Sequence, residues 1–498
     1  MKTYICDNCG FLNQIDVYNE ETVCSNCKAS YEKLRLIENQ IAENEIDAII
    51  NSVIENLTEE QEEKIINRED SEDGKSLKIS EDNPCIKKNT EKCINCGQCK
   101  KTCEKYANLK YDLNKCLNPV CIGCGECMKN CPSKAILPKE DYVEVKDVID
   151  KNEKIVAAII EPNVPYLLAD YFNLSFDGIE YKINDALRTL GFDYVFSSGL
   201  ACDINIIEEV SEFIERLKNK QLLPLITGNN SSLTKYLEVY HPSVVNNIST
   251  IKNPLFIQSE IIKENFCNEK GFNKEKIVTV GISSCISNKM KQKESNNNLD
   301  YVITVNELIK MFERDETNMN SLVEKEYDEY NDYSSSARLI DLPGGQSEVF
   351  IKTLCKLINK TKKSVNEIDE SQFMNINGIK EVNIAIGEYQ LRIAILNSIY
   401  ELDYLINSGK YKNYHYIEIN LCTDGCLDGN GYSFKDENNK NNIKENIYKS
   451  VNKYPFDNKS VKLIYSSGFS KPLSQKSVEL LHEQYNNKSN ILTNLWKN

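Results

Sequence analysis

The sequence predicts a multidomain protein of mixed α/β and α+β class. Its 498 residues suffice for about three domains of roughly 150 residues each. From Lys154 onward, short apolar runs that predict buried strands alternate with amphipathic segments such as NIIEEVSEFIERLKN. The runs are KIVAAII, PLIT, KIVTVGI, LDYVIT, VNIAIG and YHYIEINLC. This alternation predicts an open, largely parallel sheet system, in which functional groups gather beyond the carboxyl ends of the strands. Fourteen of the twenty cysteines lie between Cys6 and Cys131, which predicts small metal-stabilised units in that part of the chain.

The composition argues against several classes of protein. The formal charge is −15, from 60 basic and 75 acidic side chains, and no basic patch stands out, so we expect no nucleic-acid partner. No apolar run approaches the roughly 18 to 20 residues that span a bilayer, so we expect no membrane association. The first residues, MKTYICDNCG, do not resemble a secretory signal peptide, which favours a cytoplasmic, reducing location. In such a compartment, clustered cysteines indicate metal.

The first 30 residues contain two CxxC pairs, formed by Cys6 with Cys9 and by Cys24 with Cys27. This spacing is typical of a tetrahedral four-thiolate site in a zinc-ribbon-like module. Structural zinc is the first choice, although rubredoxin-like iron has the same ligand geometry. Residues 31–80 contain no cysteine, and apolar residues there recur at helical spacing before a charged stretch. They predict a helical arm and linker.

Residues 81–140 carry the strongest motif. C-x2-C-x2-C-x3-C occurs twice, the pattern of bacterial two-cluster ferredoxins, in which the fourth cysteine of each motif ligates the other cluster. We predict two 4Fe–4S clusters in a ferredoxin-like domain, and hence electron transfer with partner proteins; two zinc sites, the alternative, rarely use this spacing. Cys85 and Cys116 are interpreted as uninvolved thiols. The predicted ligands are Cys93, Cys96, Cys99 and Cys131 for one cluster, and Cys121, Cys124, Cys127 and Cys103 for the other.

Downstream of these motifs stand the segments TGNNSSLTKYLEVYHP, SSCISNK, LPGGQSEVF and EINLCTDGCLDGNG, followed by the tail SSGFSKPLSQKSVELLHEQY. With them, the chain from about residue 80 to its end resembles the large subunit of iron–iron hydrogenases with the small-subunit region fused at the carboxyl terminus. The resemblance implies a two-lobed hydrogenase-like α/β domain over residues 150–435 and a small-subunit-like tail over residues 436–498.

In that family, four cysteines hold a 4Fe–4S cube, and one of them bridges to a diiron unit that carries carbonyl, cyanide and a dithiolate. The resemblance places three of these ligands at Cys285, Cys422 and Cys426, the last being the bridging position. The fourth position falls on Asn230. Because an asparagine amide is a weak ligand for iron, the expected third cluster has three thiolate ligands.

The residues around the diiron unit differ from those of the family more than the cube ligands do. Asn229 matches the proton-shuttling cysteine, and Asn288 matches the lysine that anchors a cyanide, with Lys289 one position out of register. Because outer groups orient and tune a metal centre, we do not expect the diiron subcluster in its usual form. Three further sites are also replaced. Ser283 and Ser284 stand where the family has methionine and proline, Asn420 stands where it has a second methionine, and Leu255 stands where it has a glutamine.

No catalytic residue is identified. Glu209, Glu212 and Ser249 match the family's proton pathway and are candidates for a relic of it. The alternative is that they are two solvated glutamates and a serine that the fold uses structurally.

The sequence therefore predicts an iron–sulfur electron-transfer or redox-sensing protein with a hydrogenase fold and without ordinary dihydrogen turnover. Two alternatives stay open. One is a divergent active hydrogenase that reduces protons or oxidises dihydrogen. The other is a regulatory or assembly protein with structural clusters. The sequence does not identify the electron donor, the acceptor, any substrate or the oligomeric state.

Overall fold

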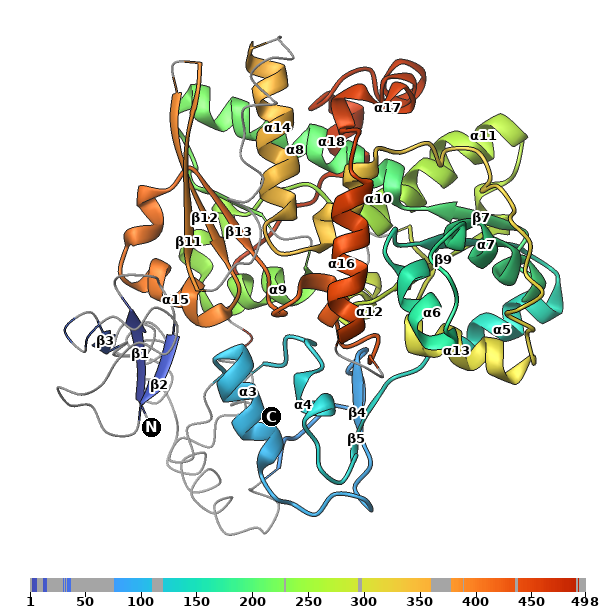
Figure 1. Ribbon diagram of the computed structural model, residues 1–498, viewed down its shortest axis with the longest axis horizontal. Coiled ribbons are helices and arrows are strands. Elements are labelled where there is room, and N and C mark those ends of the chain that lie inside the picture. Colours follow the sequence, from blue (N-terminus) through green and yellow to red (C-terminus); the bar gives the residue numbers. More distant parts are fainter. Residues whose placement is uncertain are drawn as a thin grey trace.

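Two α/β lobes lie side by side, with the cysteine-rich segment beneath them (Figure 1). Each lobe contains a four-stranded sheet. The computed structural model describes residues 2–6, 12–15, 30, 32, 34–36, 76–109, 120–227, 230–293, 298–359, 378–387, 389–434, 438–489 and 491.

The sheet of one lobe is fully parallel, in the order β10-β9-β6-β7. Val156, Ala158 and Ile160 of β6 pack into one core cluster, while Ala157 and Ile159 pack into another. The strand is apolar throughout because helices cover both faces. The strands are β6 (Ile155–Ile160), β7 (Tyr194–Ser197), β9 (Ile277–Ser283) and β10 (Tyr301–Thr304). The helices are α5 (Tyr142–Lys151), α6 (Val164–Phe172), α7 (Ile179–Thr189), α10 (Pro254–Ile261), α11 (Cys267–Lys270), α12 (Asn288–Gln292) and α13 (Val305–Arg314).

The sheet of the other lobe has the order β11-β12-β13-β8. Its last three strands are parallel, and β11 pairs antiparallel with β12 at one edge, so the sheet system is largely parallel, as expected. The strands are β8 (Leu225–Thr227), β11 (Lys380–Ile386), β12 (Tyr389–Leu396) and β13 (Tyr416–Ile419). The helices are α9 (Ser231–Tyr240), α14 (Gly345–Asn359) and α15 (Ile399–Asn407).

Helix α8 (Gly199–Asn219) lies between the lobes and packs against α10 of one and α14 of the other (Figure 1). Its polar residues are therefore buried too. The carboxylate of Glu208 accepts hydrogen bonds from Tyr465 Oη (2.8 Å) and Leu473 N (2.9 Å), which holds the C-terminal tail against α8. The tail helices are α16 (Asn438–Ser450), α17 (Lys459–Ile464) and α18 (Gln475–Leu481).

The two cysteine motifs share one local structure. Helices α3 (Gln98–Ala107) and α4 (Glu126–Lys129) each begin directly after a glycine with positive φ, which is 74° at Gly97 and 83° at Gly125. Glycine adopts this conformation without steric cost, so each loop can turn sharply into its helix. Strands β4 (Ile86–Lys88) and β5 (Ile136–Pro138) pair antiparallel and join the two ends of the segment.

Near the N-terminus, β1 (Lys2–Cys6) pairs antiparallel with both β2 (Leu12–Ile15) and β3 (Leu34–Leu36). Residues 34–36, at the start of the expected helical arm, form β3 instead, and residues 37–75 lie outside the described residues, so the rest of the arm stays a prediction. Cys9, Cys24 and Cys27 lie outside the described residues, so the four-thiolate site stays a prediction. No helix in the described part of the chain is long and apolar enough to cross a bilayer.

Candidate functional site

Four cysteines from both motifs line one small cavity: Cys93, Cys96, Cys99 and Cys131. The last of them comes from the second motif, because β5 returns the chain to β4. Two backbone N–H groups point at these sulfurs, from Leu77 to Cys99 Sγ (3.2 Å) and from Ala135 to Cys131 Sγ (3.3 Å). Such hydrogen bonds favour thiolates, so this cavity suits an iron–sulfur cluster.

This first cavity opens at a basic surface. Ile94, within the loop of ligands, is 66% exposed, and the exposed lysines Lys92, Lys101 and Lys134 flank the loop. Residues 84–139 contain eleven lysines and four acidic residues. The expectation that no basic patch exists is therefore wrong for this segment. Because the rest of the chain is acidic, the net charge of the whole chain does not reveal this patch.

The other four predicted ligands are neighbours as well. Burial raises the pKa of the Cys124 thiol, and the nearby thiols of Cys127, Cys103 and Cys121 raise it further. Asn430 Nδ2 donates a hydrogen bond to Cys124 O (2.8 Å), which ties this loop to the lobes, while Cys121 of the same set is exposed. Each set therefore has one exposed cysteine, Cys96 in the first and Cys121 in the second, and the second set is also tied to the lobes.

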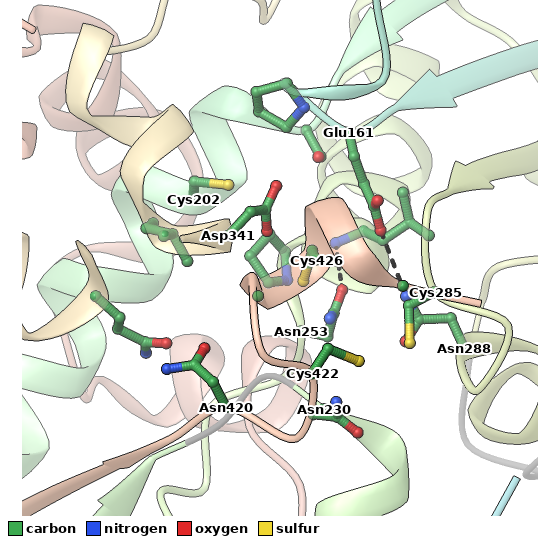
Figure 2. Close-up of a pocket in the computed structure, with 18 of the residues that line it drawn as sticks. Glu161, Cys202, Asn230, Asn253, Cys285, Asn288, Asp341, Asn420, Cys422 and Cys426 are labelled. Carbon is green, nitrogen blue, oxygen red and sulfur yellow. Dashed lines mark hydrogen bonds between the residues drawn. The ribbon is translucent and has the colours of Figure 1, made fainter. Parts of the chain in front are cut away.

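A third cavity lies between the lobes, where strands of both sheets end (Figure 2). Cys285 follows β9, Cys422 follows β13, and Cys426 lies in the 3-10 helix Gly425–Asp428. All three line this cavity, together with Asn230 at the start of α9. The structure thus brings together all four positions assigned to a third cluster. Burial raises the pKa of each of the three thiols, so a bound metal would supply the positive charge that their thiolates need.

Residues 154–430, more than half of the chain, match the family described as iron only hydrogenase large subunit, C-terminal domain. The chain belongs to this family. It is 29% identical to iron hydrogenase 1 of Clostridium pasteurianum, over 79% of this chain and 74% of that protein. These matches confirm the hydrogenase resemblance.

The chain is also similar to a protein whose name gives it a different role. It is 24% identical to the cytosolic Fe-S cluster assembly factor narfl of Danio rerio, over 68% of this chain and 88% of that protein. A solved FeFe-hydrogenase structure, HydA(deltaEFG), matches with a TM-score of 0.61 at 24% identity, covering 70% of this chain and 99% of that chain. At this identity the structural likeness establishes the hydrogenase fold.

Asn230, at the fourth cube position of the hydrogenase family, has a structural role here. Its Oδ1 accepts hydrogen bonds from Ser232 N (2.8 Å) and Leu233 N (3.2 Å), which caps the first turn of α9. Asparagine is among the strongest N-cap residues. Because two donors already use the oxygen that would bind iron, Asn230 is a helix cap rather than a fourth ligand. At the four positions assigned from the family, the cavity therefore offers three thiolates to a cube.

Replacing Asn230 by alanine tests this assignment. We expect the free energy of unfolding to fall by about 1 kcal/mol, because α9 loses its cap, and the iron content to stay unchanged. Denaturant unfolding and iron analysis measure the two effects. Asn230→Ser, which preserves a capping oxygen, should retain most of the stability. A loss of iron in Asn230→Ala alone would instead identify Asn230 as a ligand.

The cavity wall contains a glutamate that the sequence analysis missed. Glu161 directly follows β6; its Oε2 accepts a hydrogen bond from Ser284 N (2.9 Å), and its Oε1 accepts from Ser283 Oγ (2.6 Å) and Asn288 Nδ2 (3.4 Å). Three residues that replace the family's methionine, proline and lysine thus bind one carboxylate. Burial raises the pKa of Glu161, whereas these hydrogen bonds lower it. An acidic residue directly after an apolar strand was the available sequence signal.

Lys289 does not take over the role of the family's lysine. Its side chain is 1% exposed, and its Nζ lies 2.7 Å from Asp141 Oδ2 and 2.9 Å from Glu307 Oε1. These carboxylates hold it away from the third cavity, and no lysine or arginine is among the described residues that line that cavity. The diiron unit of the family, with its anionic cyanide ligands, does not fit this wall.

Two further lining residues were not expected at the site. Asp341 and Cys202 face the same cavity (Figure 2). Burial, together with the nearby Glu161 carboxylate, raises the pKa of Asp341 to about 7. Burial also raises the pKa of the Cys202 thiol. Neither residue belongs to a motif, so only the tertiary structure places them here.

The candidate proton-path residues are buried, and the expectation of solvated glutamates is wrong. Glu209, Glu212 and Ser249 are 0%, 7% and 5% exposed, because both lobes cover α8. Glu212 accepts a hydrogen bond from Ser249 Oγ (3.1 Å), and Gln346, which lines the third cavity, donates from Nε2 to Glu209 Oε2 (3.0 Å). Burial raises the pKa of Glu209 to about 7. Asn229 lies outside the described residues.

Proposed function

We propose that this chain is an iron–sulfur electron-transfer or redox-sensing protein that uses the hydrogenase fold without ordinary dihydrogen turnover. The observation that carries the proposal is the Glu161 carboxylate, which binds Ser283, Ser284 and Asn288 where the family uses a lysine to hold cyanide. Glu161 and the residues that bind it supply no cation to hold a cyanide ligand, and no lysine or arginine is among the described residues that line the cavity. The wall therefore disfavours the ligands that the hydrogenase reaction needs.

The proposed cofactors are two 4Fe–4S clusters and a third with three thiolate ligands, all of which supply one-electron transfer. Four thiolates near the N-terminus would bind structural zinc, or iron of the rubredoxin type. The ligand sets are Cys93, Cys96, Cys99 and Cys131 for the first cluster, Cys103, Cys121, Cys124 and Cys127 for the second, Cys285, Cys422 and Cys426 for the third, and Cys6, Cys9, Cys24 and Cys27 for the N-terminal metal.

The arrangement of these sites supports a direction for electron transfer. The first loop meets solvent at Ile94 among exposed lysines, which suits an acidic electron-carrier protein. The second loop is held against the lobes by the hydrogen bond from Asn430 to Cys124 O. Electrons would therefore enter at the first loop and reach the cavity between the lobes through the second.

Infrared spectroscopy on protein matured anaerobically with the hydrogenase accessory enzymes tests the proposal. We expect no carbonyl or cyanide stretches and no dihydrogen from a reduced dye. Iron analysis and electron spin resonance on the same sample should show three clusters. Carbonyl and cyanide bands together with dihydrogen evolution would establish a divergent active hydrogenase instead. Iron for only two clusters would remove the third cluster from the proposal.

A role in regulation or in iron–sulfur assembly is the second candidate. The similarity to the narfl assembly factor, which covers 88% of that protein, favours it and also supports a cytoplasmic location. In this case residues 1–80 would bind a partner and the clusters would report redox state. Co-purification of a partner that depends on residues 1–80, together with normal iron content after their removal, would favour this role over electron transfer.

A further inference from the structure

Lys235 of α9 lies where the lobes meet the cysteine-rich segment. Helices α9 and α12 contact each other directly above that segment (Figure 1). The Nζ atom of Lys235 lies 3.3 Å from Sδ of Met290, a buried residue of α12. Lys235 itself is half-buried, so its ammonium group is directed into the interface between the lobes and the cysteine-rich segment.

Met290 connects Lys235 to the second cysteine motif. Met290 and Cys85 pack in one apolar cluster at this interface. Gly123 of the second loop has a φ of 72°, and a Cβ atom there would lie 2.9 Å from Cys85 Sγ and 3.4 Å from Met290 Sδ. The sulfur atoms of Cys85 and Met290 therefore lie directly against the second loop, and the ammonium group of Lys235 lies behind Met290.

The fully buried thiol of Cys85 lies close to ligands of two predicted clusters. Burial raises the pKa of this thiol, the nearby thiols of Cys121 and Cys285 contribute to the rise, and the charge of Lys235 opposes it. Cys121 belongs to the second ligand set, and Cys285 lines the third cavity. The positive charge of Lys235 therefore acts on the region between the second set and the third cavity.

No carboxylate compensates the charge of Lys235. Within the described part of the chain, Lys235 forms no ion pair, and its hydrogen bond goes to the thioether of Met290, which is a weak acceptor. By contrast, Lys129 of α4 lies 3.2 Å from Asp428 Oδ1, so its charge is paired. The unpaired charge of Lys235 can stabilise negative charge that is added nearby.

We propose that Lys235 raises the reduction potential of the second 4Fe–4S cluster. Reduction of this cluster by one electron from a reduced carrier protein oxidises the carrier and adds one negative charge to the cluster. A cation held at Met290 stabilises that charge, because the net charge at an iron–sulfur cluster is one of the factors that set its potential. Lys235 thereby favours the passage of the electron to the second cluster. The inference rests on the proposed function, because it requires that the second ligand set holds a cluster.

A redox titration of the full-length protein, monitored by spin resonance, tests this role. The signal of the second cluster is the one that Cys124→Ser removes. Lys235→Met removes the charge and keeps a long side chain, and we expect the equilibrium constant for reduction of the second cluster to fall about tenfold, or 59 mV for one electron. Lys235→Arg should retain the wild-type potential, and Lys235→Glu should lower the potential further than Lys235→Met. A side chain that only fills space would not produce this order of potentials.

A lysine elsewhere on the surface provides the control. Lys218 is exposed at the C-terminal end of α8, so Lys218→Met should leave the potential of the second cluster unchanged. Iron analysis of each variant checks that its clusters are complete. If the equilibrium constant in Lys235→Met stays within about twofold of the wild-type value while the second-cluster signal is present, the inference alone is overturned. Absence of a second-cluster signal in the wild-type protein overturns the proposed function on which the inference rests.

Discussion

The Cys422→Ser variant is expected to lose about four iron atoms per chain, the content of one 4Fe–4S cluster. Cys422 and Cys426 come from one turn after β13, and Cys285 follows β9 of the other lobe. Asn230 already caps α9, so the four positions assigned from the family provide three thiolates, and Cys202 is a further thiol in the cavity. Two thiolates do not hold a cube, so removal of one should release it. Iron analysis and spin resonance of the reduced protein measure the loss.

Matched cysteines in the same chain provide the controls. Cys355 is buried in α14 outside the cavity, so Cys355→Ser should retain all iron and all cluster signals. Cys202→Ser tests the remaining thiol in the cavity. Full iron content in Cys422→Ser would contradict the third cluster. A loss in Cys202→Ser equal to that in Cys422→Ser would instead make Cys202 the fourth ligand.

The Lys289→Met variant is expected to lower the free energy of unfolding by about 3–5 kcal/mol, because it leaves the buried Glu307 and the partly buried Asp141 without their cation. Lys289 is 1% exposed and lies 2.7 Å from Asp141 Oδ2 and 2.9 Å from Glu307 Oε1. Its methylene groups pack in the interior, and methionine replaces them closely in size. The loss of stability therefore measures the effect of removing the positive charge. Denaturant unfolding, monitored by circular dichroism, measures it.

A second variant isolates the electrostatic cause. Lys289→Met combined with Asp141→Asn removes one of the two unpaired charges and should recover part of the stability. The exposed Lys449, paired with Glu445 on the surface of α16, is a matched control, and Lys449→Met should change stability by less than about 1 kcal/mol. If Lys289→Met lowers the free energy of unfolding by less than about 1 kcal/mol, the ion pairs of Lys289 with Asp141 and Glu307 do not hold its side chain in place, and it can reach the cavity.

Much of the fold follows from local sequence patterns. The apolar runs KIVAAII, PLIT, KIVTVGI, LDYVIT and YHYIEINLC coincide with β6, β8, β9, β10 and β13, because strands buried on both faces are apolar throughout. Strand β12 was not predicted as a strand. Its N-terminal half, YQLR, is largely exposed or half-buried, so it lacks a continuous apolar run there.

The sequence by itself determined the cysteine groups of the two motifs, since three ligands of each predicted cluster come from a single loop and their spacing is visible in the chain. It also determined the family, through motifs that survive around Cys285 and Cys422. Only the tertiary structure decided what surrounds them. Glu161 lies far in the sequence from Asp341 and Gln346, and they converge because parallel strands of two sheets end at one cavity. The order of strands in a sheet is set by packing rather than by sequence order, so no local pattern reveals which side chains will share a wall.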